Sequence, residues 1–191
     1  MSSIFSDPSF RRGTTLLSGE AIEYEGTTPI AGSEIVGQVK AFQDVDPASG
    51  KRFSNRLVYC VAARYTGTTV TDASTVAGEV YLMDFNSPLS VFSTKGTASN
   101  VLAGLAFGVL DEYLKGELRK DDIVWMVVRG PVDVKQTAAI INAGAQVQVS
   151  ATAGQIATLS TGFPIGQQID GANTTATSQL TRINLVSYDI V

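Results

Sequence analysis

Residues 121–135 restrict the fold of this chain more than any other part of the sequence. Two aspartates precede an unbroken run of six apolar residues, Ile123 to Val128, and Gly130-Pro131 then interrupts the run. In a strand, alternate side chains point to opposite faces, and here both alternating sets are apolar. The run therefore predicts a strand that is covered on both faces.

The pattern changes after the glycine and the proline. Pro131 has no N–H to donate, so it interrupts a regular ladder of hydrogen bonds. Beyond it, Val132 and Val134 alternate with Asp133 and Lys135, which is typical of a half-exposed strand. We therefore expect one long strand that contributes first to a closed core and then to a more open surface. None of its residues is a candidate for catalysis.

A hairpin is predicted upstream of this strand. Glu34–Phe42 and Arg56–Tyr65 alternate or are apolar as strands do, and the polar segment Asp44–Asn55 joins them. The spacing of acidic residues in that segment resembles a calcium loop. However, Ser49 and Asn55 stand where such a loop needs its glycine and its final glutamate, so we reject a calcium site.

Residues 101–114 are ambiguous between helix and strand. Their apolar residues form a helical stripe, but Gly104 and Gly108 would each cost a helix about 1 kcal/mol relative to Ala. We favour a strand over Ala106–Glu112. The final strand is predicted at Leu180–Val186. Its alternation changes phase at Val186, which indicates a bulge or a move between two sheets.

A degenerate internal repeat runs through residues 78–191. Each copy has four segments in the same order. The first is an Ala-Gly step followed by a strand rich in branched residues, and the second is another β-prone segment. The third starts at a glycine and ends at an aspartate, and the fourth is a run of branched apolar residues. The segments are Ala77–Leu82 and Ala143–Val149, Leu89–Ser93 and Gln155–Leu159, Gly108–Asp111 and Gly166–Asp170, and Ile123–Val128 and Leu180–Val186. The prediction is a mainly β chain with a small β-barrel or β-sandwich domain.

Three regions follow from these patterns: an N-terminal arm at 1–33, a hairpin elaboration at 34–75, and the β-barrel domain with the repeat at 76–191. The arm carries apolar and basic residues in a polar context, namely Ile4, Phe5, Phe10, Arg11 and Arg12. A segment of this kind cannot form its own core. Either it is a frayed terminus, or residues 2–13 dock on another molecule rather than on their own barrel.

The composition excludes several classes of function. The chain has no histidine, which removes Ser-His-Asp and Cys-His catalysis and most zinc sites. Cys60 lies within an apolar run, so a buried structural thiol is favoured over a nucleophile. The net charge of −4 disfavours nucleic acid and anionic lipid as partners. No signal peptide, membrane span, metal site or cofactor motif is predicted, and we expect no enzymatic activity.

From about Val76 onward, the order of segments resembles the head decoration, or capsid cement, proteins of tailed bacteriophages. The similar features are Ala143-Gly144 with its branched strand, Ile165-Gly166 with Asp170, the spacer 171–177, and Leu180–Leu185 with its arginine. The resemblance implies a virion protein on the outside of the capsid, made in the host cytoplasm. It implies that the protein binds the major capsid protein, stabilises contacts between its subunits, and forms a homotrimer or a dimer.

The resemblance also implies that the arm residues Ile4, Phe5, Phe10, Arg11 and Arg12 contact the capsid or a neighbouring subunit. Two other kinds of protein remain alternatives. One is a β-structural protein of the tail tube or baseplate, which would form rings or tubes. The other, less favoured because histidine and aromatic platforms are missing, is a ligand-binding β-barrel.

Overall fold

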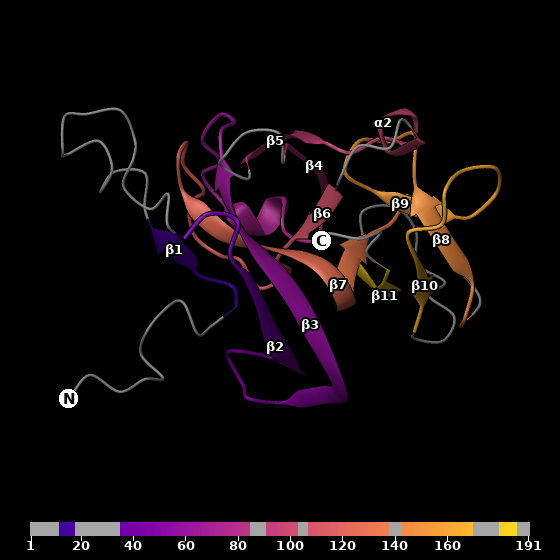
Figure 1. Ribbon diagram of the computed structural model, residues 1–191, viewed down its shortest axis with the longest axis horizontal. Coiled ribbons are helices and arrows are strands. Elements are labelled where there is room, and N and C mark those ends of the chain that lie inside the picture. Colours follow the sequence, from indigo (N-terminus) through magenta and orange to yellow (C-terminus); the bar gives the residue numbers. More distant parts are fainter. Residues whose placement is uncertain are drawn as a thin grey trace.

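The computed structural model describes residues 12–17, 35–84, 91–102, 107–137, 143–169 and 180–186. These residues form one mixed sheet of eleven strands (Figure 1). Within this described part, helix is limited to the short α2 (Ala98–Leu102) and the 3-10 turn η3 (Ala73–Thr75). The prediction of a mainly β chain is confirmed. The strands are β1 (Thr15–Leu17), β2 (Val39–Val45), β3 (Arg52–Tyr65), β4 (Val80–Asp84), β5 (Val91–Lys95), β6 (Phe107–Leu110), β7 (Ile123–Lys135), β8 (Gln146–Val149), β9 (Ile156–Thr158), β10 (Gly166–Gln168) and β11 (Leu180–Leu185).

Five strands close into a first barrel. β3 pairs with β5 in parallel and with β7 in antiparallel orientation, and the antiparallel pairs β5–β4, β4–β6 and β6–β7 complete the ring. One buried cluster takes side chains from all five strands, so it fills the barrel interior. Its strand residues are Val61, Ala63, Tyr65, Tyr81, Met83, Phe92, Leu110, Val124, Met126 and Val128.

A second ring begins where the first ends, because β7 belongs to both. Beyond Gly130, β7 pairs with β11, and the pairs β11–β10, β10–β8 and β8–β9 follow, all antiparallel. A parallel bridge between Gln136 and Ile156 then returns from β9 to the end of β7. Buried valine, leucine and isoleucine side chains of these strands belong to the other apolar core. In Figure 1 this ring lies to the right of the first.

The two rings repeat the same topology. The strands lie in the order β5-β4-β6-β7 in one and β9-β8-β10-β11 in the other. Equivalent backbone groups make equivalent hydrogen bonds. The N–H of Gly78 donates to Leu110 O at 2.9 Å, and the N–H of Gly144 donates to Gln168 O at 2.9 Å. One further strand precedes these four in each ring: β3 in the first and β7 in the second.

The two faces of β7 serve two cores, as the sequence predicts. Ile123, Trp125 and Val127 are buried in one apolar cluster, and the alternate residues of the run are buried in the other. Trp125 is 2% exposed and meets the ring of Phe42 edge-on, with centroids 5.3 Å apart. Beyond Gly130, valines are buried while Asp133 and Lys135 are half-buried. Both predictions for this strand are confirmed.

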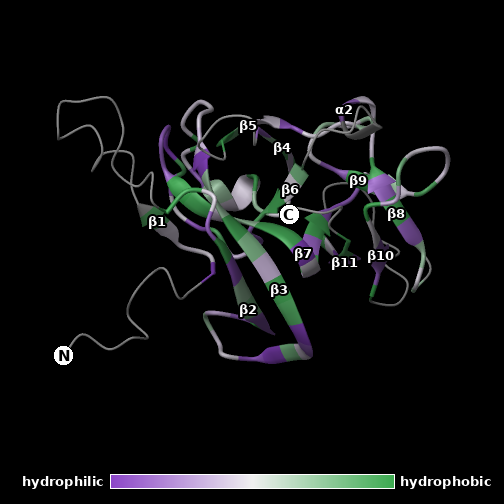
Figure 2. Cartoon of the chain, in the orientation of Figure 1, coloured by the Kyte–Doolittle hydropathy of each residue, from purple (hydrophilic) through white to green (hydrophobic). Residues whose placement is uncertain are grey.

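The hairpin differs in its limits from the sequence expectation. β2 starts at Val39 and not at Glu34, since 35–37 form a turn. β3 starts at Arg52, so the connection is shorter than the expected 44–55 loop. Asp46 organises the turn, because its carboxylate accepts hydrogen bonds from the N–H of Ala48 at 2.8 Å and from Ser49 Oγ at 2.6 Å. Figure 2 shows the hydrophilic end of this hairpin.

The ambiguous region contains a strand, as we favoured. β6 covers Phe107–Leu110, within the predicted 106–112. The five-residue α2 just before it was not predicted, because Ser99 lacks the partner of a capping box.

Strand pairing also crosses the expected boundary at residue 76. β3 supplies one wall of the first barrel, and β1 pairs with β7 through Thr15 and Leu17. Residues 12–17 and the hairpin are thus integral to the same sheet as the strands that follow.

Candidate functional site

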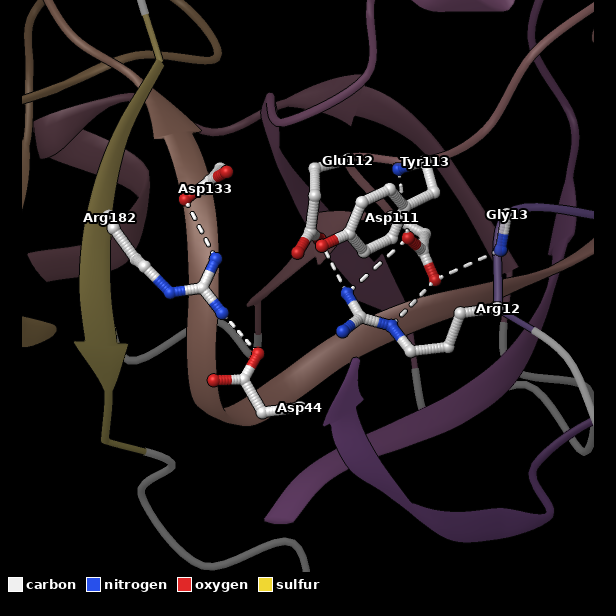
Figure 3. Close-up of polar contacts among 8 residues, drawn as sticks. All are labelled: Arg12, Gly13, Asp44, Asp111, Glu112, Tyr113, Asp133 and Arg182. Carbon is white, nitrogen blue, oxygen red and sulfur yellow. Dashed lines mark hydrogen bonds and ion pairs between the residues drawn. The ribbon is translucent and has the colours of Figure 1, made fainter. Parts of the chain in front are cut away.

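The side chain of Arg12 is buried against the segment that follows β6. Its Nε lies 3.0 Å from Asp111 Oδ2, and its Nη2 donates to Glu112 at 2.5 Å (Figure 3). The guanidinium also stacks over the Tyr113 ring, 5.2 Å from its centroid. Gly13 follows with φ of +75°, and its N–H donates to Asp111 Oδ2 at 3.3 Å. These contacts attach the N-terminal segment to the first barrel.

Burial changes the ionisation of Glu112 in this cluster. Burial raises its pKa to about 8, the Arg12 guanidinium opposes the rise, and the Asp111 carboxylate adds to it. Its Oε1 is buried without a hydrogen-bond partner among the described residues, which fits a carboxyl that resists ionisation. Burial, with a smaller contribution from Glu112, also raises the pKa of Tyr113 to about 12.

This placement corrects the expectation for Arg12. A residue that is 3% exposed and paired within its own barrel is not available for an external contact. The side chains of Asp111 and Glu112, the acidic residues that follow β6, are buried and pair with Arg12. Ile4, Phe5, Phe10 and Arg11 lie outside the described residues, so their contact with a partner remains a prediction.

A second buried cluster joins the hairpin of β2 and β3 to the second ring. Arg182 on β11 pairs with Asp44 at the end of β2 and, at 3.1 Å, with Asp133 on β7 (Figure 3). The Phe53 ring lies against the same guanidinium, 4.7 Å from its centroid. The sequence analysis missed this site, because Arg182 and Asp44 are 138 residues apart. The only available signal was a lone arginine among apolar residues of the last strand.

Beside this cluster, a groove separates β3 from β11. It consists of two hollows of about 370 Å³ each that share Arg56. The first is lined by Asp44, Phe53, Ser54, Arg56, Asp133, Ile169 and Arg182, and the second by Arg56, Leu57, Tyr59, Arg129, Gly130, Asn184, Leu185 and Val186. Four of these apolar side chains, Phe53, Leu57, Ile169 and Val186, are 37–46% exposed. The groove therefore combines apolar surface with charge.

The described residues hold no cluster of three or more potential metal-ligating side chains. Cys60 is fully buried, and burial raises the pKa of its thiol well above the ordinary value, which keeps it protonated and unreactive. In the described part of the chain, no helix has both the length and the apolar character needed to cross a bilayer.

Comparisons with known proteins give similarity at the level of structure. No protein-family model matches the sequence, and no curated protein matches it. The fold is similar to the crystal structure of the head fiber gp8.5 N base in bacteriophage phi29, with a TM-score of 0.43 and 11% identity. The match covers 70% of this chain and 98% of that one.

Proposed function

We propose that this protein is a structural component of a tailed-bacteriophage virion that binds the outer surface of the head. The observation that supports it is the fold of the segments that resemble decoration proteins. Ala143-Gly144, Ile165-Gly166 and Leu180–Leu185 lie in one antiparallel unit of β8 to β11, in which β10 pairs with both β8 and β11. The role is non-enzymatic, with no cofactor, and its partner is the major capsid protein.

The binding of such a protein depends on several weak contacts made at once. We propose that Ile4, Phe5, Phe10 and Arg11 contribute one of these contacts, on the capsid or on a neighbouring copy. Burying a large apolar side chain gives about 1.5–3 kcal/mol before ordering costs, so one arm binds weakly. An oligomer multiplies such contacts and gains avidity when the capsid lattice presents them at the right spacing.

We further propose a homotrimer, with a dimer as the alternative. A closed symmetric assembly covers strand edges, and β2 is such an edge, because it pairs only with β3 among the described residues. Sedimentation equilibrium at micromolar concentration should give about three times the 20.1 kDa chain mass. A species of 20.1 kDa at all concentrations, together with single copies on the particle, would contradict the proposal.

The function is tested by purifying the particles of the phage that encodes the protein and separating heads from tails. Quantitative mass spectrometry should find the protein on heads in a fixed ratio to the major capsid protein. Protease treatment of intact heads should remove it without opening the capsid. Recovery with tails would favour the tail-tube or baseplate alternative, and absence from particles would reject a virion role.

A further inference from the structure

We propose that the groove between β3 and β11 binds an extended, acidic segment of a protein partner, which adds as a strand to the open edge of β3. This inference depends on the groove alone and is independent of where the protein is attached. It rests on three observations: an unpaired strand edge, the equivalence of that edge to a fully paired one, and the charge of the groove.

The first half of β3 has one open edge. β2 and β7 both pair with Tyr59, Cys60 and Val61 of β3, so they occupy its opposite edges. β2 continues along the strand to Arg52, whereas β7 pairs no earlier than Tyr59. Arg52–Leu57 therefore has one edge without a strand partner among the described residues. An exposed edge of this kind is the usual site at which a partner peptide adds to a sheet.

In the repeated topology, the first half of β7 corresponds to this half-strand of β3, and it is paired on both edges. Thr66 after β3 and Thr137 after β7 make the same backbone hydrogen bond, each at 2.9 Å, to Phe92 of β5 and Ile156 of β9. Thr66 and Thr137 are therefore equivalent positions. When the same number of residues is counted back from each of them, Arg52–Val58 of β3 corresponds to 123–129 of β7. That half of β7 pairs with β3 on one edge and with β1 and β6 on the other.

The charge of the groove indicates which kind of strand it binds. Arg56 and Arg129 are exposed, line the groove, and have no carboxylate partner among the described residues. In contrast, Arg12, Arg119 and Arg182 are each paired with a carboxylate. Leu57 and Val186 line the same hollow, and each is 46% exposed. A strand with acidic residues on either side of an apolar one, spaced two apart, would match this surface.

A polyanion fits the groove less well than a peptide. Nucleic acid needs several cations along its backbone, and this hollow offers two. The adjoining hollow also contains the carboxylates of Asp44 and Asp133, and the chain carries a net charge of −4.

The test is an NMR titration of the full, isotopically labelled chain with the peptide acetyl-Gly-Glu-Ser-Val-Ser-Glu-Gly-amide. Binding is followed through the arginine Nε–Hε and backbone amide signals. We expect chemical-shift changes at Arg56 and Arg129, and slower hydrogen exchange of the backbone amides of residues 52–57. The matched peptide with Gln in place of both Glu should bind at least tenfold more weakly. Arg56→Gln and Arg129→Gln should each weaken binding at least threefold. Arg119→Gln, which removes the same charge outside the groove, should change it less than twofold.

Several results would overturn the proposal. These are no binding by the full chain, equal binding of the two peptides, or an equal loss with Arg119→Gln. Tighter binding of inorganic tripolyphosphate at the same two arginines would make the groove a polyanion site. If the peptide binds only to a chain that ends at Val186, the groove is the site of the chain's own C-terminal residues rather than of a partner.

Discussion

Arg12 shows how one side chain can decide where a terminal segment belongs. Its guanidinium is buried between Asp111, Glu112 and the Tyr113 ring, although the sequence around it is that of an exposed arm. Gly13 permits this approach, because a Cβ there would lie 2.6 Å from Tyr113 Cβ. Composition alone could not reveal the pairing, since the partners are about 100 residues away in the sequence.

Replacing Arg12 by Ala should destabilise the protein by about 3–5 kcal/mol, because it leaves two buried carboxyls without their cation. Urea denaturation followed by Trp125 fluorescence measures the loss. Arg56→Ala is the control, since Arg56 is exposed and should change stability by less than about 0.5 kcal/mol. Equal effects of the two substitutions would show that Arg12 is not buried in its own barrel.

Glu112 should make stability fall as the pH rises. Its pKa is about 8 in the folded chain and near 4.5 when exposed, so the folded state holds the proton more tightly. The stabilisation is complete below about pH 4.5 and is lost as the pH rises through about 8. Between pH 5 and pH 8, the melting temperature of the wild type should fall more than that of Glu112→Gln. The difference should be at least about 2–4 °C, which corresponds to about 1 kcal/mol. Parallel curves for the two proteins would contradict a raised pKa.

Among the elements, β7 carries the connection between the two barrels. It exchanges β3 for β11 as its partner at Gly130, where φ is +100° and a Cβ would lie 2.3 Å from Leu57 O. Glycine is needed at this position both for the backbone conformation and for the close approach of β3.

Gly130→Ala should therefore destabilise the protein by more than about 3 kcal/mol, since the strain of its backbone alone costs about 1–3 kcal/mol. Gly50→Ala is the matched control. Gly50 also has a positive φ, of +71°, but its Cβ would meet no atom within 4 Å. Chemical denaturation of both variants separates the clash from the strain. If Gly130→Ala is no worse than Gly50→Ala, the strand exchange does not require the close contact.

Local pattern was sufficient to predict most of this element. The two apolar faces of Ile123–Val128 and the break at Gly130-Pro131 follow from residues that are adjacent in the sequence. The four-segment repeat is likewise a prediction from turn and strand residues that lie close together within each segment. The sharing of β7 could not be predicted, because it depends on β3–β7 and β7–β11 pairing between distant segments. The Arg182–Asp44 pair was missed for the same reason.

For the whole molecule, we expect the arm to end near Arg12, since Arg12 itself is buried. A chain that lacks residues 2–10 retains the Arg12 cluster and β1, so its melting temperature should stay within about 2 °C of the wild type. Its attachment to phage heads should weaken by more than tenfold, because three large apolar side chains are lost. A chain that lacks residues 2–13 should also lose stability. If removal of residues 2–10 lowers the melting temperature as much as removal of residues 2–13 does, residues 2–10 belong to the core of their own chain. If their removal leaves attachment to phage heads unchanged, residues 2–10 are only a frayed terminus.

The proposed place of the protein on the virion is tested by a cryo-electron microscopy map of the native particle. The two-barrel unit, with β7 running through both rings, can be docked into the density of such a map. We predict that it fits density on the outside of the head, above seams between major capsid subunits, in copies related by the local symmetry. A head surface without this density, or a fit only in the tail tube or baseplate, would contradict the proposed function.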